Sequence, residues 1–133
     1  MYVEDEEDDA LLMQMAFRRA GVGSALQVVG DGREAIKYLE GRNGYENRER
    51  HPMPRVLLLD LNLPDMSGFD VLEWLKANPE LTTLPVVIFS SSSREEDKRR
   101  ARELGAVEYI EKPISAAAFG SIAQRLSEQW LGG

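Results

Sequence analysis

The feature that most constrains the fold is a regular alternation between short, β-rich apolar runs and segments with apolar residues at helical spacing. Strands that alternate with helices form a parallel sheet, because each right-handed crossover returns the chain to the same edge. The expected strands cover residues 2–3, 26–29, 56–59, 86–89 and 107–110, and the expected helices cover residues 7–20, 32–40, 68–77, 94–104 and 116–131.

The ends of the expected helices carry residues that stabilise helix termini. Asp31 and Ser67 stand where an N-cap is expected. Ser93 is followed three positions later by Glu96, which is a capping-box spacing. We therefore expect a doubly wound α/β fold in which five parallel strands are covered by five helices.

Length and composition narrow the class of protein. A chain of 133 residues fits one domain, and 43% apolar residues is enough for one core. The absence of cysteine excludes a disulfide framework, a thiol nucleophile and cysteine-ligated zinc, and is consistent with the cytoplasm. A net charge of −7 disfavours binding to nucleic acid. No apolar run approaches the ~20 residues of a membrane span, and no leader is apparent, so we expect a cytoplasmic protein.

Polar side chains follow four of the expected strands. Glu4 and Asp5 follow the first strand, Asp60 follows the third, Ser90 the fourth and Lys112 the fifth. Because parallel strands present their carboxyl ends at one edge, we expect these side chains to converge there. Crowded carboxylates raise one another's pKa unless a cation compensates, and oxygen ligands favour Mg²⁺.

This constellation indicates chemistry centred on Asp60. A carboxylate surrounded by Mg²⁺, an ammonium group and a hydroxyl is suited to carry a phosphoryl group, because such transfers depend on positioning and charge neutralisation. Of the acidic segment "EDEEDD", we expect only Glu4 and Asp5 to reach the site. Residues 6–9 are expected to stabilise the start of the first helix.

Four segments together resemble the receiver domain of two-component response regulators, the CheY-like family. They are "VED" at 3–5, "LLLDLNLPDMSG" at 57–68, "PVVIFSS" at 85–91 and "GAVEYIEKP" at 105–113. The resemblance covers residues 1–133 and implies a single receiver domain with a flavodoxin-like sheet in the strand order 2-1-3-4-5.

The resemblance also implies roles for individual residues. Asp60 would accept a phosphoryl group from the phosphohistidine of a sensor histidine kinase or a phosphotransfer protein. The Mg²⁺ ligands would be Asp5 directly, Glu4 through water, the Asp60 carboxylate and the backbone carbonyl of Asn62.

The remaining roles concern the switch. Lys112 and Ser90 would contact the phosphoryl group. Movement of Ser90 would allow Tyr109 to turn inward and repack the face built by the fourth helix, the fifth strand and the fifth helix.

Other features are similar to the single-domain regulators associated with bacterial phytochromes. They include the polar insertion at 42–54, in which we expect His51 to be solvated. This resemblance implies homodimerisation through the switch face, with Phe119 and Trp130 as interface or core residues. The expected first strand is so short that the chain is predicted to lack a few native residues before it.

Two other functions stay open. A pseudo-receiver would share the fold and bind its partner without phosphorylation. A small hydrolase would use Asp60 against an external phosphate ester. We expect neither, and predict a phosphoacceptor switch that is not an enzyme on external substrates.

Overall fold

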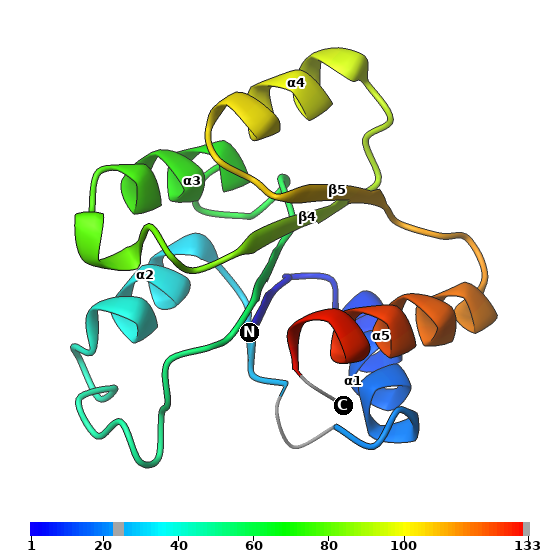
Figure 1. The fold of residues 1–133 in the computed structure, drawn as a ribbon, viewed down its shortest axis with the longest axis horizontal. Helices are drawn as coiled ribbons and strands as arrows, with labels where there is room; N and C mark the ends of the chain where they lie inside the picture. Colours follow the sequence, from blue (N-terminus) through cyan, green and yellow to red (C-terminus); the bar gives the residue numbers. More distant parts are fainter. Residues whose placement is uncertain (23–25, 132–133) are drawn as a thin grey trace.

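The chain folds into a five-stranded parallel sheet with helices on both faces (Figure 1). The computed structural model describes residues 1–22 and 26–131. The strand order β2-β1-β3-β4-β5 confirms the predicted doubly wound fold. The strands are β1 (Tyr2–Val3), β2 (Val28–Val29), β3 (Leu57–Leu59), β4 (Val86–Ser90) and β5 (Glu108–Glu111); the helices are α1 (Glu7–Arg19), α2 (Gly32–Glu40), α3 (Gly68–Lys76), α4 (Glu95–Glu103) and α5 (Ala116–Trp130), and a 3-10 turn, η2 (Pro79–Leu81), follows α3.

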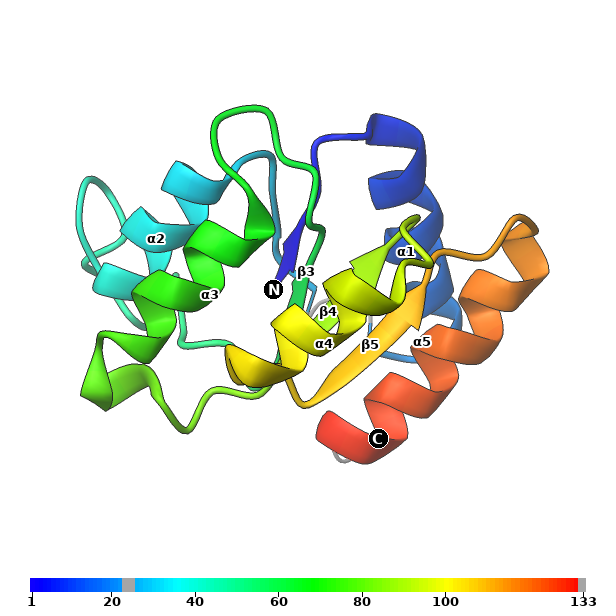
Figure 2. The same ribbon diagram turned by 90° about the horizontal axis from the view of Figure 1, so that it is seen from above.

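The helices form two layers. Helices α1 and α5 pack side by side on one face of the sheet, and α2, α3 and α4 cover the other (Figures 1 and 2). Successive side chains of β3 divide between the two cores: Leu58 lies under α1 and α5, and Leu57 and Leu59 lie on the opposite face. None of the helices in the described part of the chain is long and apolar enough to cross a membrane.

Side-chain caps define the start of two helices, as predicted. The carboxylate of Asp31 accepts a hydrogen bond from the backbone N–H of Glu34 at 2.8 Å and begins α2. Ser67 forms a capping box with Asp70 at the start of α3. Each cap satisfies backbone donors that the first helical turn leaves without partners.

The predicted capping box at Ser93 is wrong. Helix α4 begins one residue later than expected, and its N-cap residue, Arg94, makes no side-chain cap bond. The physical reason is that Ser92 organises this loop instead. Its hydroxyl accepts a hydrogen bond from the Arg94 N–H at 3.3 Å and donates to the Asp97 carboxylate at 2.6 Å.

Strand β1 occupies the centre of the sheet, between β2 and β3, although it has only two residues. Tyr2 and Val3 are both fully buried. The short central strand is therefore as the sequence indicated, and the suggestion that native residues precede it stays a prediction.

The insertion at 42–54 closes the carboxyl end of α2. The Arg48 guanidinium donates hydrogen bonds to the carbonyls of Tyr38, Leu39 and His51 at 2.8–3.2 Å. The bond to Leu39 satisfies a carbonyl that the last helical turn does not pair, and the bond to His51 ties the insertion to the end of α2. His51 lies in a loop, as predicted, but it is only partly exposed, because its ring lies edge-on to Tyr38 with centroids 5.8 Å apart.

Candidate functional site

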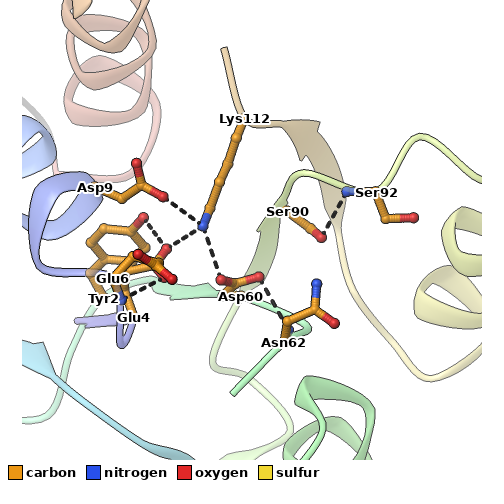
Figure 3. Close-up of polar contacts among 9 residues, drawn as sticks. All are labelled: Tyr2, Glu4, Glu6, Asp9, Asp60, Asn62, Ser90, Ser92 and Lys112. Atoms are coloured by element: carbon orange, nitrogen blue, oxygen red, sulfur yellow. Dashed lines mark hydrogen bonds and ion pairs between the residues drawn. The ribbon is translucent and has the colours of Figure 1, made fainter. Parts of the chain in front are cut away.

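Four strands bring polar side chains to one edge of the sheet. Glu4 follows β1, Asp60 follows β3, Ser90 is the last residue of β4, and Lys112 follows β5. The strands are parallel, so these positions lie at the same edge, as Figure 3 shows. The structure thus brings together the residues that the sequence singled out, while their chemical roles stay predictions.

Lys112 is the centre of the polar contacts (Figure 3). Its Nζ atom lies 2.6 Å from Glu4 Oε1, 2.9 Å from Asp60 Oδ2 and 3.0 Å from Asp9 Oδ2. Burial lowers the pKa of Lys112, but the hydrogen bonds to the three carboxylates outweigh this effect and hold the pKa above its usual value. The ammonium group is therefore charged at neutral pH.

The Asp60 carboxylate is buried, with 4% of the residue exposed, yet both of its oxygens have donors. Oδ2 contacts Lys112, and Oδ1 accepts a hydrogen bond from the Asn62 N–H at 3.2 Å. A buried charge is tolerable when it is paired and hydrogen-bonded. Asn62, predicted to ligate a metal through its carbonyl, thus lies directly beside Asp60.

Glu4 is held more firmly than its neighbours. Its Oε1 atom accepts a hydrogen bond from the Tyr2 hydroxyl at 2.7 Å, and Oε2 accepts one from the Glu6 N–H at 3.2 Å. Burial raises the pKa of Glu4 to about 7, although the hydrogen bonds from Lys112 and Tyr2 oppose the rise. The ionised form of Glu4 is therefore costly in the absence of further positive charge.

Three carboxylates are arranged to hold a metal ion. Glu4, Asp5 and Asp60 each offer an oxygen, and these atoms lie within 4.8 Å of one another. Two of these residues are buried, whereas Asp5 is exposed and opens the cluster to solvent. A cluster of oxygen ligands with an open side fits a hard divalent cation that keeps some of its water.

The two predicted switch residues meet through Ser92. The hydroxyl oxygen of Ser90, which is fully buried, accepts a hydrogen bond from the Ser92 N–H at 3.2 Å. The hydroxyl of Tyr109, which is half-buried, donates to the Ser92 carbonyl at 2.9 Å. The loop between β4 and α4 therefore connects Ser90 to Tyr109.

Sequence reasoning missed two residues of the site. The prediction that Asp9 serves only the helix terminus is wrong, because its carboxylate contacts Lys112. Tyr2 was expected only as a strand residue. Helical spacing places Glu7, Asp8 and Asp9 on different faces of the first turn, but it does not reveal which face meets Lys112.

The two residues suggested for a dimer interface belong to different environments. Phe119 is 2% exposed and packs edge-on against Phe89, with ring centroids 5.5 Å apart, so it is a core residue. Trp130 is half-buried against the same core. Its indole N–H is buried without a hydrogen-bond partner in the described part of the chain.

Gly68 allows the loop after β3 to fold tightly against Asp60. Its N–H donates to the Leu61 carbonyl at 2.9 Å. A Cβ atom at this position would overlap the backbone of Asp60 and Leu61. The absence of a side chain at Gly68 therefore permits the close approach that supports the Asp60 backbone.

Comparisons with known proteins agree with this geometry. Residues 1–124 match the response regulator receiver domain family. Response regulator Rcp1 of Synechocystis is 33% identical over 131 residues, which cover 98% of this chain and 87% of Rcp1. The crystal structure of the phosphorylated cyanobacterial phytochrome response regulator RcpA superposes with a TM-score of 0.89 at 35% identity and covers 98% of this chain and 91% of RcpA.

A metal-bound relative is also similar. The structure of the Mn²⁺-bound form of Rcp1 has a TM-score of 0.82 and 32% identity, and it covers 98% of this chain and 91% of the Rcp1 chain. The family match spans most of the chain, and the relatives include phytochrome response regulators, as the sequence indicated. The chain therefore belongs to the response regulator receiver domain family of two-component signalling.

Proposed function

We propose that Asp60 is the phosphoacceptor of a signalling switch and that a phosphohistidine of a sensor histidine kinase or a phosphotransfer protein is its donor. The observation that carries this proposal is the environment of the Asp60 carboxylate. It is 4% exposed, lies 2.9 Å from the Lys112 ammonium, and belongs to the carboxylate cluster with Glu4 and Asp5.

The proposed reaction is an in-line phosphoryl transfer. An Asp60 oxygen forms a bond to phosphorus while the phosphorus–nitrogen bond of the donor breaks, and the electron pair of that bond stays with the histidine nitrogen. Lys112 holds the carboxylate in place and neutralises charge on the incoming oxygens. Mg²⁺, bound by Asp5, Asp60, the Asn62 carbonyl and, through water, Glu4, would supply the further positive charge that the transferred group needs.

We assign the conformational response to the Ser90–Ser92–Tyr109 connection. A phosphoryl oxygen is a strong acceptor and would attract the Ser90 hydroxyl. Ser90 then releases the Ser92 N–H, which frees the loop that holds the Tyr109 hydroxyl. Tyr109 lies on β5, so its movement alters the surface of β5 and its neighbours α4 and α5.

This surface is the proposed contact with other proteins. It contains the exposed side chain of Val107, which is 55% exposed. Ion pairs cross it from α4 to β5, between Lys98 and Glu111 at 2.8 Å, and from α5 to β5, between Arg125 and Glu108 at 2.6 Å. A second copy of this chain is the proposed occupant. The net negative charge of the protein disfavours binding of nucleic acid or of an anionic membrane to this surface.

The proposal is tested by phosphorylation in vitro. The protein is incubated with acetyl phosphate and Mg²⁺, or with autophosphorylated histidine kinases, and the modified residue is mapped by mass spectrometry. We expect one phosphorylated aspartate, Asp60, and no modification in Asp60→Asn or after chelation of Mg²⁺. Modification at another residue, or equal modification of Asp60→Asn, would contradict the proposal.

Two further measurements, a Mg²⁺ titration and the turnover of an external phosphate ester, separate the alternative functions. A pseudo-receiver would bind no Mg²⁺ and remain unmodified with every donor. A hydrolase would turn over an external phosphate ester many times, at a rate that Asp60→Asn abolishes. We expect self-phosphorylation and self-dephosphorylation only, so turnover of external esters should be the same in the wild type and in Asp60→Asn.

Dimerisation is tested by light scattering after size-exclusion chromatography, with and without beryllofluoride and Mg²⁺. Val107→Glu places a charge on the proposed face and should yield a monomer. Leu11→Glu is the matched control, because Leu11 is as exposed as Val107, at 55%, but lies on α1. A dimer that survives Val107→Glu would exclude this face.

A further inference from the structure

Lys112 has as many carboxylate partners in this structure as it has N–H bonds. An ammonium group has three N–H bonds, and its nitrogen forms ion pairs with three carboxylates: Glu4, Asp60 and Asp9, at 2.6, 2.9 and 3.0 Å. The Asp60 and Asp9 carboxylates accept hydrogen bonds from it. A phosphoryl group on Asp60 presents new acceptor oxygens to the same ammonium. One of the existing partners must therefore be released before Lys112 can contact the phosphoryl group fully.

The three partners differ in how easily they can be released. The Glu4 side chain is fully buried and is fixed by hydrogen bonds from Tyr2 and from the Glu6 backbone. Asp60 is the acceptor of the phosphoryl group itself. The Asp9 side chain is 29% exposed, and within the described residues its carboxylate has no hydrogen-bond partner except Lys112. Water can solvate the Asp9 carboxylate when the ion pair opens, so Asp9 costs the least to release.

We infer that Asp9 is a displaceable partner of Lys112 that opposes phosphorylation of Asp60. The Asp9–Lys112 ion pair stabilises the unphosphorylated state and must open for Lys112 to bind the phosphoryl oxygens. The negative charge of Asp9 also repels the incoming phosphoryl group. Asp9 is thus a positioning residue that acts through Lys112. This inference rests on the proposed function, because it concerns the rate at which Asp60 is phosphorylated.

The test compares Asp9→Asn with Asp8→Asn. Both substitutions remove one negative charge from the first turn of α1, but Asp8 is exposed and makes no contact with Lys112 in the structure. The wild type and both variants are incubated with acetyl phosphate and Mg²⁺, and the phosphorylated fraction is followed by mass spectrometry. Dephosphorylation is followed separately after the donor is removed.

We expect Asp9→Asn to be phosphorylated roughly two to five times faster than Asp8→Asn, a range that fits a partly exposed ion pair. Its dephosphorylation rate should match that of Asp8→Asn, because Lys112 contacts the phosphoryl group both in the phosphorylated protein and during its hydrolysis. A general structural disturbance would change both rates.

Each outcome decides between the two proposals. If the wild type and Asp8→Asn are phosphorylated and Asp9→Asn is no faster than Asp8→Asn, the role of Asp9 is refuted while the proposed function stands. If Asp9→Asn is phosphorylated faster but also dephosphorylated faster by the same factor, the displacement of Asp9 is refuted. If neither the wild type nor Asp8→Asn is phosphorylated, the proposed function fails and the inference fails with it.

Discussion

Neutralising Glu4 should stabilise the protein at alkaline pH. Burial raises the pKa of Glu4 from 4.5 to about 7. A group whose pKa is higher in the folded state contributes stability below its unfolded pKa, and loses that contribution as the pH rises through the folded value. At about 1.4 kcal/mol for each pKa unit, the ionised carboxylate lowers the free energy of unfolding by about 3 kcal/mol above pH 7. Glu4→Gln removes this cost, and its amide oxygen can still accept from Lys112 and Tyr2. Its amide nitrogen cannot accept the hydrogen bond from the Glu6 N–H, and the loss of that bond offsets about 1 kcal/mol of the gain.

The assay is urea unfolding monitored by tryptophan fluorescence at several pH values between 5 and 8, with Mg²⁺ removed by a chelator. We expect Glu4→Gln to exceed the wild type by about 2 kcal/mol in the free energy of unfolding at pH 8, with a difference that shrinks steadily toward pH 5. Added Mg²⁺ should narrow the difference at pH 8, because a bound cation stabilises only the protein that keeps the full carboxylate cluster.

Glu7→Gln is the control for a general effect of charge. Glu7 is exposed on the first turn of α1, so its substitution should change the free energy of unfolding by at most ~0.5 kcal/mol, with no trend between pH 5 and pH 8. The reasoning would be refuted if Glu4→Gln were less stable than the wild type at pH 8, or if the difference did not depend on pH.

Three further substitutions, one of them paired with a control, probe the support of the site and of the helix beside it. Gly68→Ala should lose about 2 kcal/mol of unfolding free energy, because its Cβ would overlap the backbone of Asp60 and Leu61. A Cβ at Gly120 in α5 would meet no atom within 4 Å, so Gly120→Ala should gain up to ~1 kcal/mol. Thermal unfolding should therefore show a lower melting temperature for the first variant and a higher one for the second. Tyr2→Phe should lose about 1–2 kcal/mol in urea unfolding, since a buried Glu4 oxygen loses a donor, and an unchanged midpoint would contradict this. Asp65→Ala should lose about 1 kcal/mol of unfolding free energy in the same assay, because the Asp65 carboxylate accepts hydrogen bonds from two backbone amides at the start of α2. Full stability of the variant would show that water replaces this cap.

Local rules predicted most of the fold. The bounds of α2 were expected at residues 32–40 and are found there, because Asp31 caps one end and Gly41 adopts a left-handed conformation at the other. The Ser93 prediction failed for a tertiary reason. The Ser92 carbonyl accepts a hydrogen bond from the hydroxyl of Tyr109 on β5, and the spacing of residues around Ser93 does not predict this contact.

The sequence predicted the site residues that follow strands, but it did not predict the site residue that lies on a helix. Asp60 and Lys112 follow strands, and the ends of parallel strands converge by construction. Asp9 reaches the site only because the first turn of α1 lies beside the end of β5, so its contact with Lys112 joins residues 103 positions apart. That placement follows from the packing of α1 against α5, which involves many side chains and no short motif.

The protein's own residues leave the site with an excess of negative charge. Glu4, Asp5, Asp9 and Asp60 carry four negative charges when ionised, and Lys112 contributes one positive charge, which leaves three negative charges in a partly buried cluster. The raised pKa of Glu4 shows one way to relieve the excess, which is to keep a proton. A divalent cation would relieve it without a proton and would leave the Asp60 carboxylate free to act as the nucleophile that we propose. Under the proposed function, a phosphoryl group on Asp60 would add further negative charge to the same cluster, so we expect the cation to bind before the phosphoryl group is transferred.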